Sequence, residues 1–444
     1  MACRAEVVAT SPVMNPLAAP LDVAIVGAGI AGVIHLHYAR RAGLRALVFE
    51  RAPAVGGLWR TLPAWQDIQI SPADWALGGL PLEGALQAQV LANIEGWVRH
   101  FDLADGIRFS TPVEKATPTA DGWLLQTPDG PVLARHLVAA TGAHNRPRVP
   151  PVHRQASTVQ EWHAGALHDP GVLRQRNVLV VGGGASAFDL LDQCIEQGAK
   201  HITWVHRGLK WFVPTGKPKH IAGSVRGFAR MQASGLSAAE QSAAIDADMR
   251  QRYQRFGLGS ILPQQPFDVL KDQLIPGRPR MMAHFGSLHR VPGSVVAIEG
   301  RSVTLSGGQS VDTDVLLWGT GYEMDLRWID VPALAAVRST DALMARCGCI
   351  FRSLDAGNLY LPQTGLDGIG AAPFANALLA RSTMSHIKGT AQLDMAAVGH
   401  KVNHFDIVAH LAPRDSGSFE PGVWQEQFRS LALQTPDEQP YPLP

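Results

Sequence analysis

Cysteine, net charge and long apolar runs are all scarce in this chain, and each shortage excludes a class of protein. Four cysteines in 444 residues are too few for a disulfide framework and favour a reducing, cytoplasmic location. The 39 lysines and arginines nearly balance the 38 aspartates and glutamates, without a basic stripe, so we expect no nucleic-acid partner. No apolar run reaches the roughly 18 residues that span a bilayer, so we expect no membrane segment.

Glycine, proline and apolar residues, by contrast, are abundant. The 44 glycines and 31 prolines predict many tight turns, and an apolar fraction of 46% is enough for large cores. Because 444 residues exceed one typical domain, we expect two or three packed units. Residues 1–20 carry no long apolar stretch, so we expect a flexible tail there and not a signal peptide.

A glycine pattern near the N-terminus predicts a dinucleotide-binding turn. An apolar strand over 23–26 leads into Gly27-x-Gly29-x-x-Gly32, a helix follows, and a second strand ends at Glu50. The first glycine permits the bend, the second lets a pyrophosphate approach the backbone, and the third lets the helix pack on the strand. The helix N-terminus offers free N–H groups to the phosphates, and Glu50 is placed to accept hydrogen bonds from a ribose. Strand, helix, second strand and acid occur in register, which favours dinucleotide binding over a purely structural turn.

The chain repeats this plan 155 residues later, with two differences. The second turn is Gly182-x-Gly184-x-x-Ala187, and its helix has apolar residues at positions 187, 190, 191, 194 and 195, the spacing of a buried face. Its second strand ends at Arg207, where the first unit has an acid. A guanidinium suits the 2′-phosphate of NADPH, which a carboxylate would repel. The alternative is that Arg207 is an ordinary solvated residue at a strand end.

The repeat extends beyond the turns and predicts a duplicated module. A hairpin turning at 128–130 precedes an apolar strand that closes on Thr-Gly at 137–142. A second hairpin, turning at 307–308, precedes a similar strand over 315–321. The predicted fold is therefore α/β, with two Rossmann-like dinucleotide-binding domains, the second nested within the first. Such a protein would hold two dinucleotides at once.

Two further motifs suggest a family. The first is Gly-Gly-Leu-Trp at 56–59, and the second is "DVLLWGTGY" at 314–322, in which Trp318 and Gly319 stand where the family has Leu or Phe and Ala. With the two turns, the chain resembles the two-dinucleotide-binding-domain flavoproteins, and within them the class B flavin-dependent monooxygenases, from about residue 21 to beyond 380. The resemblance implies FAD on the first module and NADPH on the second.

The resemblance also implies domain boundaries and cofactor-binding residues. The boundaries are a tail over 1–20, an FAD-binding domain over 21–160 that resumes over 323–444, and an NADPH-binding domain over 161–322. The cofactor-binding residues would be Gly27, Gly29, Gly32, Glu50, Gly57, Leu58, Trp59, Thr141, Gly142, Gly182, Gly184, Ser186, Ala187, Arg207 and Gly321. We expect no metal site.

The chain departs from the family at two places. Of the F-x-G-x-x-x-H-S-x-x-(W/Y) fingerprint only His163 is present, because Ser157 and Val159 replace the Phe and the Gly. His163 is either functional or a surface or capping histidine. Where related enzymes carry Asn-x-Pro near the flavin, this chain has Ser71-Pro, preceded by Gln69. Gln69 and Ser71 are candidate catalytic residues, since both can donate to an anionic oxygen species; the alternative is an ordinary loop.

The resemblance implies a mechanism. NADPH would reduce FAD, O₂ would add to give a C4a-(hydro)peroxide, and retained NADP⁺ would shield it until a small-molecule nitrogen or sulfur is oxygenated. "GGLWR" is closer to heteroatom oxidisers than to the G-G-T-W pattern of Baeyer–Villiger enzymes. The alternatives are Baeyer–Villiger oxygenation and a non-oxygenating NADPH oxidase or reductase on the same fold. A disulfide reductase needs a C-x-x-C or C-x₄-C pair by the flavin, and Cys347-Gly-Cys349 lies far from either expected place.

Two segments leave the repeating pattern. The stretch over 212–290 contains a capping box, Ser237-x-x-Glu240, and a helix after it, which predicts either a lid or substrate wall or a homodimer surface. Near the end, a glycine-rich turn runs into an apolar helix over 364–380. We expect this segment to return to the flavin.

Overall fold

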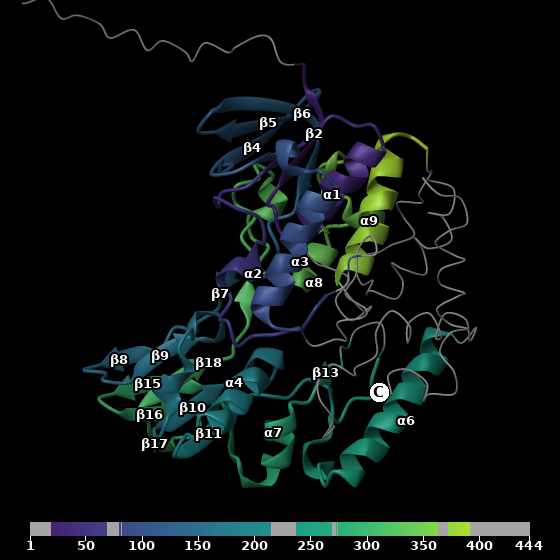
Figure 1. Cartoon of the computed structure of the whole chain (residues 1–444). Helices are drawn as coiled ribbons and strands as arrows, with labels where there is room; N and C mark the ends of the chain where they lie inside the picture. Colours follow the sequence, from purple (N-terminus) through teal and green to yellow (C-terminus); the bar gives the residue numbers. More distant parts are fainter. Residues whose placement is uncertain are drawn as a thin grey trace, which may run out of the picture.

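Two sheets with parallel strands at their centres organise the described part of the chain. The computed structural model describes residues 19–68, 80, 82–214, 237–268, 272, 274–362 and 372–390. Each sheet forms the middle of one lobe, and Figure 1 shows the two lobes one above the other.

The first sheet begins with the predicted N-terminal strand. Its strands run in the order β3-β2-β1-β6-β5-β4, and β20 also pairs with β6. Their bounds are β1 Leu21–Val26, β2 Ala46–Phe49, β3 Ile107–Arg108, β4 Lys115–Thr119, β5 Gly122–Thr127, β6 Gly130–Ala139 and β20 Leu359–Tyr360. β1 pairs in parallel with β2 and β6, whereas β5 pairs with β6 as the predicted antiparallel hairpin. Strand β1 is almost wholly buried, as expected for the centre of a covered parallel sheet.

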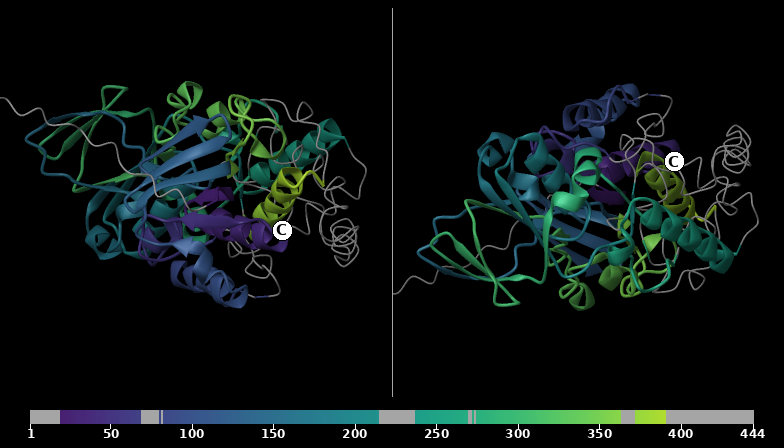
Figure 2. Two further views of the ribbon diagram at one scale, coloured as in Figure 1. Left: turned by 90° about the horizontal axis from the view of Figure 1, so that it is seen from above. Right: turned by 90° about the horizontal axis from the view of Figure 1, so that it is seen from below.

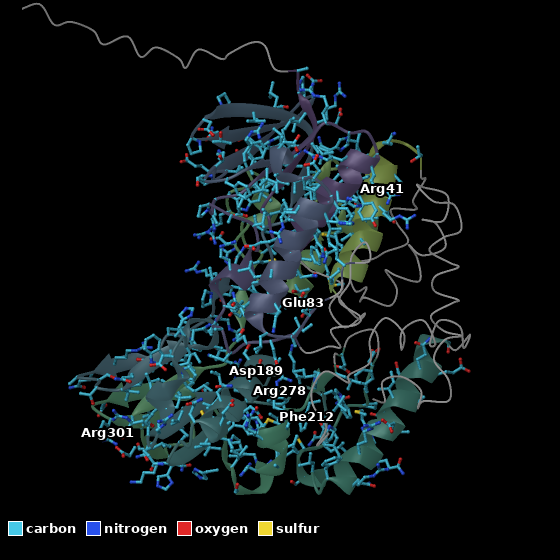
Figure 3. All side chains as sticks on the ribbon, viewed as in Figure 1. Arg41, Glu83, Asp189, Phe212, Arg278 and Arg301 are labelled. Carbon is cyan, nitrogen blue, oxygen red and sulfur yellow. The ribbon has the colours of Figure 1, made fainter. Side chains whose placement is uncertain are left out.

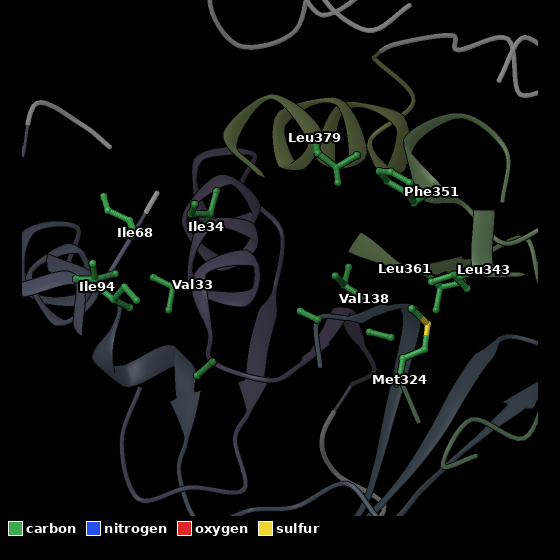
Figure 4. Packing of buried hydrophobic residues seen from close by; sticks show 14 of the residues in the cluster. Val33, Ile34, Ile68, Ile94, Val138, Met324, Leu343, Phe351, Leu361 and Leu379 are labelled. Atoms are coloured by element: carbon green, nitrogen blue, oxygen red, sulfur yellow. The ribbon is translucent and has the colours of Figure 1, made fainter. Parts of the chain in front are cut away.

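Three helices build the core of this lobe. They are α1 Ile30–Arg41, α3 Gln87–His100 and α9 Ala372–Ile387. Of the predicted inner face of α1, Val33, Ile34 and Tyr38 are buried and Ile30 is half-buried. Figure 4 shows Val33 and Ile34 of α1 between Ile94 of α3 and Leu379 of α9. Two short helices, α2 Leu58–Thr61 and α8 Thr340–Met344, complete the set, and no described helix has the length and apolar character to cross a bilayer.

The second sheet contains the second module. Its order is β14-β11-β10-β18-β9, with all neighbouring pairs parallel. The bounds are β9 Gln160–His163, β10 Asn177–Val181, β11 His201–His206, β14 His289–Pro292 and β18 Val315–Trp318. Helix α4, Ala185–Glu196, packs on it with the predicted face, since Ala187, Leu190, Leu191 and Cys194 are all buried.

The two modules differ in their hairpins. In the first, the second strand of the hairpin continues as the closing strand, and the two together are β6. In the second, β15 Val295–Glu299, β16 Ser302–Leu305 and β17 Ser310–Asp312 form a separate sheet with β8 His153–Gln155. The chain turns between β16 and β17 as predicted, but also at Gly300, between β15 and β16.

The chain enters and leaves the second lobe through one narrow ribbon. β7 Arg146–Pro147, on the way in, pairs antiparallel with β19 Tyr322–Glu323, on the way out. After β19 the chain returns to the first sheet as β20, which confirms the nested α/β architecture with two Rossmann-like units. The Trp65 indole adds a second link, since its Nε1 donates to the carbonyl of Leu167 at 2.6 Å.

The excursion within the second module is anchored by aromatic packing. Helix α6, Ala238–Arg255, starts at the predicted capping box: Ser237 Oγ accepts from the N–H of Glu240, and Glu240 Oε2 accepts from the N–H of Ser237. Its inner face carries Tyr253, whose hydroxyl accepts from the N–H of Phe212 at 3.3 Å. The excursion also holds β12 Phe212–Val213, β13 Ile275–Pro276 and α7 Pro279–Ala283. Figure 2 shows α6 at the periphery in both views.

A buried ion pair joins the end of this excursion to α4. Arg278 is fully buried, and its Nε donates to Asp189 Oδ1 at 2.5 Å (Figure 3). Its Nη1 donates to the carbonyl of Pro276 at 2.8 Å. Arg280 extends the contact by pairing with Asp192 and Glu196 of α4. Because a guanidinium cannot lose its charge at neutral pH, Asp189 is needed to compensate it.

We predict that Asp189→Ala lowers the free energy of unfolding by about 3 kcal/mol, because it leaves the Arg278 charge buried without its carboxylate. The matched control is Lys115→Ala, which removes an ion pair to Asp330 whose side chains are 47% and 43% exposed. This control should cost less than about 1 kcal/mol. Chemical denaturation of both variants measures the difference, and equal losses would contradict the assignment.

Candidate functional site

The first glycine turn is built so that only its middle residue is open. A Cβ on Gly27, whose φ is +101°, would lie 2.7 Å from the carbonyl oxygen of Ala140. A Cβ on Gly32 would lie 1.8 Å from the carbonyl oxygen of Gly27. Both positions therefore require glycine for the protein's own packing. A Cβ on Gly29 would meet nothing closer than the Cα of Gly57 at 3.6 Å, so the space beside Gly29 is available to a ligand.

The second glycine turn has the same construction. A Cβ on Gly182 would lie 2.2 Å from the carbonyl oxygen of Gly319, whereas a Cβ on Gly184 would meet no atom within 4 Å. Each turn follows the carboxyl end of a central parallel strand and opens a helix, and Ser186 lies in the first turn of α4. Open backbone at this place, with the N–H groups of a helix start beside it, can accommodate a pyrophosphate.

The other residues predicted for the first cofactor gather around the first turn. The N–H of Gly56 donates to the carbonyl of Ala28 at 3.0 Å, and a Cβ on Gly57 would lie 2.9 Å from the Cα of Gly29. Leu58 and Trp59 begin α2 directly after this pair. Thr141 and Gly142 follow the end of β6, and the Cα of Thr141 would lie 3.4 Å from a Cβ on Gly27.

Glu50 has a structural contact that sequence reasoning missed. Its buried carboxylate accepts from the N–H of Ala28 through Oε2 at 2.6 Å and from the N–H of Ala52 through Oε1 at 2.8 Å. The side chain thus holds the first turn from the end of β2. A carboxylate has about four acceptor positions, so Glu50 retains capacity for the ribose hydroxyl groups that the sequence predicted.

Strand pairing shows that the residue equivalent to Glu50 lies one position earlier in the second module than the sequence predicted. Val26 pairs with Phe49 in the first sheet, and Val181 pairs with Val205 in the second, so His206, and not Arg207, matches Glu50. Arg207 follows one residue later and is exposed, with no ion pair among the residues that the structure describes. Its charge is therefore available to an anionic group at the end of β11.

Two differences between the modules compensate each other. A Cβ on Gly319 would lie 2.7 Å from the Cα of Ala187 and 2.9 Å from its Cβ. In the first module Ala140 holds the place of Gly319, and Gly32 holds that of Ala187. The first module thus carries a methyl group after the closing strand, whereas the second carries it on the helix. Together the two changes keep the same close contact between helix and closing strand.

His163 caps a turn and ties it to the end of the second module. Its Nδ1 accepts from the N–H of Gly165 at 3.2 Å, which leaves the ring proton on Nε2 for donation to the carbonyl of Gly321 at 2.9 Å. Burial lowers the pKa of this imidazole, and the ring of Tyr322 lies edge-on at 4.8 Å. The capping alternative is therefore observed. Gln69 and Ser71, and the glycine-rich turn before α9, lie outside the described residues.

The cysteines do not form a redox pair in the part of the chain that is described. Cys194 lies on the buried face of α4, and Cys347 is buried after α8; both are free thiols. Burial raises the pKa of Cys347 to about 12 and also raises the pKa of Cys194. Such thiols are poor nucleophiles at neutral pH. Within the same ranges no group of His, Cys, Asp or Glu side chains could hold a metal ion.

Comparison with known proteins identifies relatives. The profile of the family described as pyridine nucleotide-disulphide oxidoreductase matches residues 24–245, half of the chain. An uncharacterized CzcO-like oxidoreductase of Geobacillus kaustophilus is 21% identical over 70% of this chain and 83% of its own length. Senecionine N-oxygenase of Tyria jacobaeae is 24% identical over 43% of this chain, which spans about half (48%) of that protein.

Solved structures share the fold. The crystal structure of OTEMO in complex with FAD and NADP matches with a TM-score of 0.65 and 17% identity, over 83% of this chain and 84% of that one. At this identity the likeness concerns the arrangement of the two lobes and not the chemistry.

We predict that alanine at either open position blocks one cofactor selectively. Gly29→Ala adds a methyl group where the first pyrophosphate must approach, so FAD content should fall at least about tenfold while the fold persists. Gly184→Ala should weaken NADP⁺ binding similarly and leave FAD in place. Gly96→Ala, in α3, adds an equally unobstructed Cβ away from both turns and serves as the control.

Flavin absorbance after gel filtration measures the first effect, and calorimetric titration with NADP⁺ measures the second. Full flavin absorbance in folded Gly29→Ala protein would show that the first turn does not hold FAD.

Proposed function

This chain belongs to the pyridine nucleotide-disulphide oxidoreductase family, and on that premise we propose that it is an NADPH- and O₂-dependent flavoprotein monooxygenase. Its substrate is a small molecule that it oxygenates at nitrogen or sulfur. The observation that carries this proposal is the pair of glycine turns, each open only at its middle residue, Gly29 and Gly184. Two such turns on separate sheets fit two dinucleotides.

The residues around the first turn fit FAD. Gly27, Gly29 and Gly32 bring the backbone to the pyrophosphate, and Glu50 accepts from the adenine-side ribose while it holds the turn. Gly57, Leu58, Trp59, Thr141 and Gly142 border the same space. When bound and reduced by NADPH, FAD supplies the chemistry that activates O₂. The protein's contribution is to orient the two cofactors and to exclude water.

The residues around the second turn fit NADPH. Gly182, Gly184, Ser186 and Ala187 present the start of α4 to the pyrophosphate, and Arg207 binds the 2′-phosphate. His163 fixes the carbonyl of Gly321, where the second lobe meets the connecting ribbon. That contact fixes the backbone directly after the closing strand β18.

The burial of the cysteine thiols favours monooxygenation over dithiol chemistry. Disulfide reduction needs two reactive cysteines beside the flavin, but Cys194 and Cys347, the cysteines whose side chains the structure describes, are free and buried, and their pKa values are raised. O₂ is then the natural acceptor for the reduced flavin. The N-oxygenase among the relatives and the "GGLWR" motif support a heteroatom substrate. Baeyer–Villiger oxygenation is the second candidate, and the cytoplasmic location and homodimer stay predictions.

We expect purified, FAD-loaded protein to consume NADPH and O₂ in step with an N-oxide or S-oxide product for at least one amine or thioether. The test is a screen of amines, thioethers and ketones with NADPH consumption, H₂O₂ and product all quantified. An ester or lactone from a ketone would establish the Baeyer–Villiger alternative. H₂O₂ equal to the NADPH consumed, with no oxygenated product, would contradict the proposal and favour an oxidase.

A second prediction concerns nucleotide choice. Charge-assisted hydrogen bonds from Arg207 to the 2′-phosphate are worth about 1.5–3 kcal/mol, so Arg207→Ala should reduce the preference for NADPH over NADH about tenfold or more. The control is Arg176→Ala, which changes a half-exposed arginine at the opposite end of the same sheet. Steady-state kcat/KM for both nucleotides measures the effect. Equal values for NADPH and NADH in the unmodified enzyme would refute the role of Arg207.

A further inference from the structure

We propose that Trp204 is a positioning residue that fixes the first peptide of the NADPH turn and thereby presents the N–H of Gly183 as a donor to the nucleotide. This inference rests on the proposed function, because it assumes that the second turn binds NADPH. It concerns residues that the glycine pattern itself does not specify.

The indole of Trp204 makes a directed contact from the middle of β11. Trp204 is fully buried, and its Nε1 donates to the carbonyl oxygen of Gly182 at 2.7 Å. Aromatic neighbours hold the ring in place: Phe188 of α4 and Phe285 lie edge-on with centroids at 5.9 Å, and His206 lies at 4.8 Å. A ring confined on three sides has little freedom to release the hydrogen bond.

In the first module the equivalent peptide is held by its N–H and not by its C=O. By strand register Val48 occupies the place of Trp204. There it is the N–H of Ala28 that is held, by the carboxylate of Glu50 from the neighbouring strand. In a trans peptide the C=O and the following N–H point to opposite sides. The peptide after Gly27 thus turns its N–H toward the second strand, and the peptide after Gly182 turns its C=O there.

The residues around the second turn fit this orientation. In the first module the Gly27 carbonyl lies where a Cβ on Gly32 would stand, only 1.8 Å away. The second module has Ala187 at that position, so its methyl group excludes the same arrangement. The φ of Gly182 is +139°, compared with +101° for Gly27. Trp204 supplies the donor that the displaced carbonyl needs.

The consequence is a free backbone donor. Ala28 N–H is used by Glu50, whereas the N–H of Gly183 has no acceptor among the described residues. Glycine is required at 183 because a Cβ there would lie 2.0 Å from the carbonyl oxygen of Gly208. The Gly182–Gly183 peptide therefore lies between an indole that fixes its C=O and a site where its N–H can meet a phosphate or ribose oxygen.

The test is Trp204→Phe, which keeps an aromatic ring and removes the N–H donor. We expect the dissociation constant for NADP⁺ to rise about tenfold, the ratio that 1.4 kcal/mol produces. FAD content should not change, because the first turn is not altered. The matched control is Trp123→Phe in the first sheet, because Trp123 is equally buried and its Nε1 donates to Asn358 Oδ1 at 3.0 Å. Both variants should lose similar thermal stability, but only Trp204→Phe should lose NADP⁺ affinity.

The outcomes separate this inference from the proposed function. If the unmodified protein does not bind NADP⁺, the proposed function is wrong. If it binds NADP⁺ and Trp204→Phe binds equally well, or if Trp204→Phe also loses FAD, the positioning role is wrong. Should Trp204→Phe fail to fold, benzothienylalanine at position 204 decides, since it keeps the bicyclic shape without the N–H; unchanged NADP⁺ affinity in that variant overturns the inference.

Discussion

The close approach of backbone to backbone where a helix starts above a parallel strand is the constraint on which this structure depends. At Gly32 and Gly182 there is no room for even one methyl group, because the opposing carbonyl oxygens lie 1.8 Å and 2.2 Å from where the Cβ atoms would stand. The rest of each lobe follows from meeting this constraint. The closing strand must end at a small residue, the second strand must supply an anchoring side chain, and the helix must present its apolar face to the sheet.

The two modules meet the same constraint with different residues. In the first, the residue without a side chain is Gly32 on the helix, and the carboxylate of Glu50 holds the turn. In the second, it is Gly319 after the closing strand, and the neutral indole of Trp204 holds the turn. This difference has an electrostatic result. The carboxylate beside the first turn suits a ribose with free hydroxyl groups, whereas a site without a carboxylate can admit a further phosphate.

Sequence reasoning could predict the strands and helices because they rest on local patterns: apolar runs, glycine spacing and a capping box. It could predict the nesting because the module is repeated along the chain. It could identify Glu50 as an acid at a strand end, but not its bond to Ala28, because that contact depends on the side-chain direction at the turn. It treated Arg207 as the equivalent of Glu50, whereas the strand register makes His206 the equivalent residue. Counting residues cannot detect a one-residue difference in the loop that leads from the helix to the second strand. The link between Ala187 and Gly319, 132 positions apart in the chain, also required the fold.

The nested topology has a consequence for how the protein is made. β20 completes the first sheet beside β6, and α9 covers α1, yet both emerge from the ribosome long after their partners. About 220 residues separate Leu137 from Leu359, which at translation rates of roughly 5–20 residues per second is a delay of about 10–45 s. During this interval the second lobe, whose central sheet comes from one continuous stretch of chain, can fold by itself. The part of α1 that α9 covers meanwhile stays exposed to water, so the lobe that is synthesised first is the one that depends longest on protection from aggregation.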